Sequence, residues 1–113
     1  MHELSLAENL REIIEAEAGR QGFGQVKKVC LQIGKLSCVM PSAMRFCFDE
    51  VMRGSMAEGA VLEIEEVEGK GFCPVCRTTV SMEALYDLCP ECQKPMDVIQ
   101  GLEIRIQALE VVG

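Results

Sequence analysis

The sequence is poor in aromatic residues and in histidine. Its 113 residues include no tryptophan, one tyrosine, four phenylalanines and a single histidine. Because rings are so scarce, a packed core has to be built from Leu, Ile, Val, Met and the few Phe residues. No paired carboxylates and no serine–histidine or cysteine–histidine set appear beyond that one histidine. We therefore expect a protein that is not an enzyme.

The sequence also lacks an excess of basic residues and any long apolar run. Eleven Lys and Arg residues are outnumbered by eighteen Asp and Glu residues, which gives a net charge of −7. Neutralising phosphates requires clustered basic residues, so this composition argues against general nucleic-acid binding and favours protein or cation partners. No apolar run approaches 18 residues, so no membrane span is predicted. The opening Met1-His2-Glu3 does not have the pattern of a secretory signal sequence, and we expect a reducing, cytoplasmic location.

Cysteine, in contrast, is plentiful, with seven residues in the chain. Four of them form two Cys-x-x-Cys pairs separated by twelve residues: Cys73, Cys76, Cys89 and Cys92. This spacing allows four thiolates to bind one tetrahedral ion, with Zn–S distances of about 2.3 Å. Pro74 and Pro90 each follow the first cysteine of a pair and favour a tight turn there. Because four sulfurs leave no position for substrate, we predict a structural Zn²⁺ that stabilises a segment too small to have its own core.

Two other uses of the four cysteines stay open at this point. They are a pair of disulfides, which would need an oxidising compartment, and an iron–thiolate site for electron transfer. The odd number of cysteines leaves Cys30, Cys38 and Cys47 outside the set, which suits a reducing compartment. For Cys38, an ordinary buried or loop thiol is favoured over an additional soft metal ligand.

Two helices are predicted in the first half of the chain. The first runs from about Ser5 to Ala18 and ends at Gly19 and Gly22, and Ser5 with Glu8 has the pattern of a capping box. One of its faces is apolar, formed by Leu6, Leu10, Ile13 and Ile14. The second begins at Pro41 and ends near Gly54. Its stripe of apolar and sulfur-containing residues is interpreted as packing rather than as a ligand surface: Met44, Cys47, Phe48, Val51 and Met52.

Three strands are predicted from alternating polarity. The first covers Val26 to Ile33, with Val29, Leu31 and Ile33 on one face; the second covers Val61 to Val67. The third contains Leu102, Ile104 and Ile106. The last two strands could pair as neighbours, with the cysteine segment inserted between them. We predict one domain from residues 1–68 plus 101–113 and an inserted domain from residues 69–100. Gly69, Gly71 and Gly101 at the two crossings are expected to let the insert tilt.

The amino terminus is a second candidate metal site. The only histidine, His2, lies beside the terminal amine, and Glu3 follows as an oxygen donor. The amine, the deprotonated amide nitrogen of His2 and its ring nitrogen can form fused chelate rings, a nitrogen-rich set that suits Ni(II) and Cu(II) better than zinc. By itself this signal competes with the simpler reading of a frayed terminus.

Several stretches together resemble one known family. They are Met1-His2-Glu3-Leu4-Ser5, Ile33-Gly34-Lys35-Leu36-Ser37-Cys38-Val39, Phe46-Cys47-Phe48-Asp49 and the two Cys-x-x-Cys pairs. In this order they are similar, over essentially the whole chain, to the HypA/HybF family of nickel metallochaperones for [NiFe]-hydrogenase maturation. The combination is far more specific than any single stretch.

The resemblance implies an α+β fold, in which a small mixed three-stranded sheet with two helices forms a nickel domain and carries an inserted four-Cys zinc-ribbon-like module. It implies that Ni²⁺, a transient cargo, is held by His2, Glu3 and the nearby backbone, and that Zn²⁺ is held by Cys73, Cys76, Cys89 and Cys92. The implied partners are a HypB-type GTPase, the hydrogenase large-subunit precursor and, for some members, urease accessory proteins. Whether the chain is a monomer or a homodimer is left open.

This chain departs from some relatives in two places. Arg77 and Gln93 follow the two cysteine pairs, where certain members have a histidine, so a zinc switch driven by histidine is not expected. Met40 occupies a loop position at which some members have an acidic residue. The main alternative function is a zinc-ribbon adaptor in nucleic-acid or transcription complexes. It would need a basic, aromatic face, whereas acidic residues outnumber basic ones in the cysteine segment.

Overall fold

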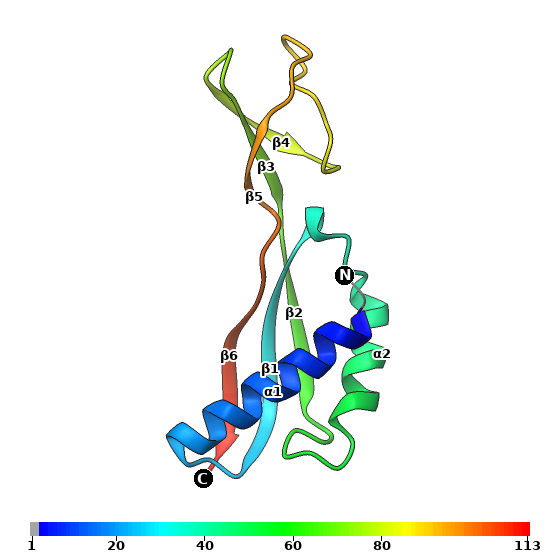
Figure 1. Ribbon diagram of the computed structural model, residues 1–113, viewed down its shortest axis with the longest axis vertical. Helices are drawn as coiled ribbons and strands as arrows, with labels where there is room; N and C mark the ends of the chain where they lie inside the picture. The colour runs from blue at the N-terminus through cyan, green and yellow to red at the C-terminus, as the bar shows by residue number, and fades with distance from the viewer. Residues whose placement is uncertain (1–2) are drawn as a thin grey trace. The chain divides into compact units, whose positions relative to one another are not determined.

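The computed structural model describes residues 3–113 and shows an α+β protein with two α-helices and two three-stranded sheets. Its elements, in chain order, are α1 (Glu3–Gln21), β1 (Gln25–Gly34), a short 3₁₀ helix η1 (Lys35–Ser37), α2 (Pro41–Met52), β2 (Val61–Val67), β3 (Gly69–Cys73), β4 (Thr78–Met82), β5 (Asp97–Gln100) and β6 (Ile104–Val112). Figure 1 labels the α-helices and the strands along the chain. The predicted fold class is confirmed.

The chain divides into two compact units. The first contains the residues up to Leu31, Val39–Ile64 and Ile106–Gly113; the second contains Gln32–Cys38 and Glu65–Arg105. Strands β1, β2 and β6 each run from one unit into the other. The predicted domains, residues 1–68 plus 101–113 and residues 69–100, were defined by the metal that each would bind. The two compact units are defined by contacts within the fold, so this division stays a prediction.

The sheet of order β2-β1-β6 is mixed. β1 and β2 run in the same direction, since Lys28 pairs with Glu63 and, further along both strands, Gln32 bonds to Glu65. β6 is antiparallel to β1, because the amide of Gly24, just before β1, donates to Val112 at the end of β6, whereas the amide of Gly34 at the end of β1 donates to Glu103, just before β6. Parallel neighbours require a crossover connection, which α2 supplies. The prediction that the second and third strands could pair is wrong, because β1 lies between them. With Val26, Val29 and Leu31 buried, β1 has the residues of a central strand.

The core of the first unit lies between the helices and the sheet. Figure 1 shows α1 crossing one face of β1, with α2 beside it. The buried residues are Leu6, Ala7, Leu10, Ile14 and Ala18 of α1, Met44, Phe48 and Met52 of α2, and Val26, Val29, Leu31 and Leu62 of the strands. The methionine stripe therefore packs in the core, as predicted. Ile13 is an exception among the predicted core residues, because 42% of it is exposed.

Helix α1 starts earlier than the capping box predicted. It begins at Glu3, so Ser5 lies within the first turn instead of preceding the helix. An acidic residue in the first turn favours a helix start there through its interaction with the helix dipole. Pro41, in contrast, occupies the start of α2 as predicted. Within the described residues, no helix has the length and apolar character needed to cross a membrane.

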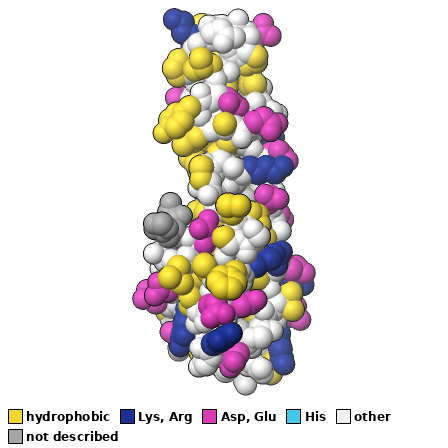
Figure 2. All heavy atoms as spheres, turned by 90° about the vertical axis from the view of Figure 1, so that its right-hand side faces the viewer, with side chains coloured by type: hydrophobic (Ala, Val, Ile, Leu, Met, Phe, Trp, Pro, Cys, Tyr) yellow, Lys and Arg dark blue, Asp and Glu magenta, His cyan; other side chains and the backbone are white. Residues whose placement is uncertain are grey.

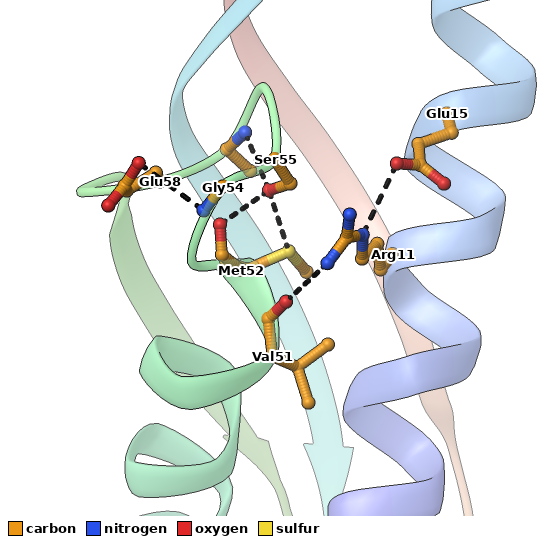
Figure 3. A network of polar contacts seen from close by, with 8 residues as sticks. Arg11, Glu15, Val51, Met52, Gly54, Ser55 and Glu58 are labelled. Carbon is orange, nitrogen blue, oxygen red and sulfur yellow. Dashed lines mark hydrogen bonds and ion pairs between the residues drawn. The ribbon is translucent and has the colours of Figure 1, made fainter.

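Arg11 joins the two helices. Its Nη1 donates to the carbonyl of Val51 at 2.8 Å, and its Nε bonds to Glu15 at 3.2 Å (Figure 3). The Val51 carbonyl belongs to the last turn of α2, where carbonyl groups lack helical partners. The guanidinium thereby satisfies an otherwise unpaired group and places positive charge at the negative end of α2.

Replacing Arg11 by methionine is expected to lower the free energy of unfolding by about 1 kcal/mol, because a hydrogen bond from a charged donor is lost. Arg20→Met on the same helix is the matched control. Arg20 pairs with Glu17 in a largely exposed position, where an ion pair contributes little. Thermal denaturation followed by circular dichroism measures both variants; equal effects would argue against the role of the Val51 contact.

Candidate metal centre

The first cysteine pair lies at the turn between β3 and β4. Cys73 is the last residue of β3 and pairs with Thr78, the first of β4. The amide of Arg77 donates to the carbonyl of Cys73 at 2.7 Å, and Arg77 has a left-handed backbone with φ of 56°. The amide of Cys76 points at the sulfur of Cys73, 3.3 Å away. The turn thus directs both thiols of the pair to the same side.

The second pair repeats this geometry. The amide of Gln93 donates to the carbonyl of Cys89 at 2.8 Å, and Gln93 also has a left-handed backbone, with φ of 61°. Cys89 is fixed further by its own amide, which donates to the carbonyl of Lys94. The similarity of the two sequences, Cys-Pro-Val-Cys and Cys-Pro-Glu-Cys, is therefore matched by two turns of the same form.

The four sulfur atoms lie together, all within 4.8 Å of one another. The sulfurs of Cys73 and Cys92 are 3.5 Å apart and those of Cys76 and Cys89 are 4.0 Å apart. A tetrahedral ion with bonds of about 2.3 Å places its sulfur ligands roughly 3.8 Å from one another. These separations are far longer than the roughly 2.05 Å of a disulfide bond. The cluster therefore fits one four-coordinate ion and does not consist of two disulfides.

The surroundings of the thiols shift the pKa of Cys73 and that of Cys76 in opposite directions. The amide of Cys76 lowers the pKa of the Cys73 thiol to about 7 because it donates to the sulfur. The Cys92 side chain and desolvation raise the pKa of Cys76 to about 12. One thiolate therefore forms near neutral pH, whereas further ionisation requires a cation to offset the charge. A divalent metal ion supplies the positive charge that lets the other thiols ionise. A set of four sulfur ligands suits zinc or iron.

The other cysteines lie apart from this cluster. Cys30 is half-buried on β1 and its thiol lies 3.7 Å from the carboxylate of Glu63. Cys38 is exposed and follows η1 with a left-handed backbone, and Cys47 is half-buried on α2. In residues 3–113, the four-Cys cluster is the one group of three or more His, Cys, Asp or Glu side chains with metal-binding geometry. Cys38 is not part of it.

Of the two residues predicted to bind at the amino terminus, His2 lies outside the described residues. Glu3 occupies the first turn of α1, and its Oε2 accepts a hydrogen bond from the backbone amide of Met40 at 3.1 Å. Met40 is the residue that precedes α2. The sequence contains no local signal for this contact, because 37 positions separate the two residues.

The chain is similar to one protein family over almost its whole length. A family model described as "Hydrogenase/urease nickel incorporation, metallochaperone, hypA" matches residues 1–111. The hydrogenase maturation factor HypA of Acidithiobacillus ferrooxidans is 48% identical over 112 residues, which cover 98% of this chain and 99% of that protein. The protein of the same name from Azotobacter chroococcum mcd 1 is 46% identical with the same coverage.

Solved structures agree with these similarities. The solution structure of the nickel metallochaperone HypA from Helicobacter pylori matches with a TM-score of 0.75 and 27% sequence identity. The match covers 100% of this chain and 99% of that one. A second solution structure, of a HypA protein, matches with a TM-score of 0.73 at the same identity. Fold, sequence and cysteine cluster therefore point to the same family.

Proposed function

Because the chain belongs to the HypA family of nickel metallochaperones for hydrogenase and urease, we propose that it binds Ni²⁺ at its amino terminus and delivers the ion for assembly of the [NiFe]-hydrogenase active site. In this proposal His2 and Glu3 are the nickel ligands, and Cys73, Cys76, Cys89 and Cys92 hold a structural Zn²⁺. The chain acts as a carrier of metal rather than as a catalyst.

The observation that carries the proposal is that the sulfur cluster is complete by itself. Four cysteines satisfy a tetrahedral ion, and two of them, Cys73 and Cys89, are fully buried. An ion held in this way has no open position and is poorly suited to transfer. A carrier in this family therefore needs a second set of donors. The amine, amide and imidazole nitrogens of the first two residues with the carboxylate of Glu3 provide one whose chemistry suits Ni(II).

Nickel held by so few side chains at a chain end is bound loosely enough for an acceptor to remove it. The acceptors we propose are a HypB-type GTPase and the hydrogenase large-subunit precursor, with urease accessory proteins as further clients, all in the cytoplasm. Figure 2 shows hydrophobic side chains exposed among charged ones, as protein partners require. Among the described residues, the most exposed large hydrophobic side chains include Met40, Phe46, Val75 and Tyr86.

His2→Ala is expected to weaken nickel binding by more than about tenfold, since even the outer partners of metal ligands contribute that much to affinity. Isothermal titration of the untagged protein with NiCl₂ measures the effect. A variant with two residues added before Met1 should show a similar loss, because it moves the terminal amine away from His2. Cys38→Ala is the control and should bind nickel normally. Equal affinity in all four proteins would refute the amino-terminal site.

A further inference from the structure

The hydrogen bond between Glu3 and Met40 connects the first turn of α1 to the start of α2. The acceptor is Oε2 of Glu3 and the donor is the main-chain N–H of Met40, at 3.1 Å. Met40 is the N-cap residue of α2, has an extended backbone with φ of −86° and ψ of 121°, and makes no side-chain cap of its own. Both residues belong to the first compact unit.

This contact is favourable for electrostatic reasons. The N–H groups at the start of a helix have no partners within the helix, and the helix dipole places partial positive charge there. A carboxylate from another element supplies both an acceptor and negative charge, and such charge-assisted hydrogen bonds are stronger than neutral ones. The contact therefore favours one direction of the Glu3 carboxylate.

We propose that the Met40 N–H is a positioning group for the nickel site, holding the Glu3 carboxylate in the orientation in which it binds the ion. This inference rests on the proposed function, which makes Glu3 a nickel ligand. A carboxylate has enough lone pairs to accept the N–H and bind a cation at once, and carboxylates that bind metals are commonly hydrogen-bonded in this way. Held by α2, the carboxylate loses less rotamer entropy when nickel binds.

The donor is the main chain of Met40, and its side chain takes no part in the hydrogen bond. That side chain is 62% exposed. Replacement by alanine therefore keeps the N–H and removes only the thioether, whereas replacement by proline removes the N–H. Proline is compatible with this position, because φ of −86° lies close to the range of proline and the backbone is already extended ahead of Pro41.

The test compares the nickel affinities of five proteins by titration with NiCl₂: wild type, Met40→Ala, Met40→Pro, Glu3→Gln and the double variant Glu3→Gln with Met40→Pro. Met40→Pro is expected to bind nickel about tenfold more weakly, the loss typical when the partner of a metal ligand is removed. Met40→Ala should stay within about twofold of wild type, at the same zinc content. In the Glu3→Gln background, Met40→Pro should cause no further loss, because the carboxylate through which it acts is absent.

Unchanged or increased affinity in Met40→Pro overturns the inference, as does an equal loss in Met40→Ala, which would assign the effect to the thioether. Hydrogen exchange of the Met40 amide in the wild-type protein provides a reading that does not depend on a variant's folding. Protection should persist when nickel is added, and loss of protection contradicts a held carboxylate. If His2→Ala leaves nickel binding intact, the proposed function itself fails; if only the Met40 variants disagree, the inference alone fails.

Discussion

Replacing Cys73 and Cys76 together by alanine is expected to abolish binding of one zinc ion per chain and to unfold the cysteine segment. Cys73 is fully buried and its sulfur lies 3.5 Å from that of Cys92, so the double variant removes half of a closed ligand set. Structural zinc in small domains contributes roughly 10–16 kcal/mol of apparent binding free energy, which is folding free energy for the segment it holds. No local packing can replace a term of this size.

Two measurements check this result. Elemental analysis gives the zinc content, and hydrogen exchange reports where protection is lost. We expect loss across residues 69–100 together with retention of most helical signal in circular dichroism, because α1 and α2 bury their residues in the first unit.

Cys30→Ala with Cys47→Ala is the matched control, since it also removes two thiols but touches no member of the cluster. It should keep its zinc and its protection. A Cys73/Cys76 variant that retains one tightly bound zinc would contradict the assignment of the site.

Replacing Gly34 by alanine is expected to lower the free energy of unfolding by about 3 kcal/mol, the upper end of the range for overpacking. The added Cβ would overlap with the carbonyl group of Gly101, which is main chain and cannot turn aside. The two backbone segments around Gly34 and Gly101 cannot move apart freely either, because the amide of Leu36 donates to the Gly101 carbonyl at 2.8 Å. The φ of Gly34 is −70°, so the penalty is steric and not conformational.

Gly19→Ala is the control, because it makes the same glycine-to-alanine substitution at a position without steric overlap. Gly19 lies within α1, and a Cβ there meets no atom within 4 Å. Alanine should therefore stabilise the protein by about 0.5–1 kcal/mol through its higher helix propensity. Chemical denaturation of the zinc-loaded proteins measures both changes. A Gly34→Ala protein as stable as wild type would show that the close approach of Gly34 to Gly101 is not required.

The glycines near the cysteine segment were predicted to let it tilt, which stays a prediction, and the structure shows that they also lie in closely packed positions. Gly69 and Gly71 lie within β3 instead of interrupting the chain. A Cβ on Gly69 would come within 2.5 Å of the Met82 carbonyl, and one on Gly101 within 2.8 Å of the Gly69 Cα. Leu36 packs against both glycines and is itself buried. These positions require glycine for close packing, which a sequence pattern does not distinguish from flexibility.

The periodicity of apolar residues was sufficient to predict the bounds of elements that bury one face. The second predicted strand, Val61–Val67, has the bounds of β2, and α2 begins at Pro41 as expected. These features depend on neighbouring residues, whose alternation or helical spacing is present in the chain itself. The expectation that Ile13 and Leu102 belong to apolar, packed faces was wrong, and Leu102 lies before β6 instead of within it. Both fit the local pattern, yet Ile13 is 42% exposed and Leu102 is 50% exposed.

The sequence by itself determined the two helices, the strands of the mixed sheet and the pairing of four cysteines as one ligand set, because each depends on spacing along the chain. Only the tertiary structure decided that β1 lies between β2 and β6, that Gly34 meets Gly101, and that Glu3 bonds to Met40. These contacts join residues 33 or more positions apart. Such contacts are selected by the packing of the whole fold, which no local pattern encodes.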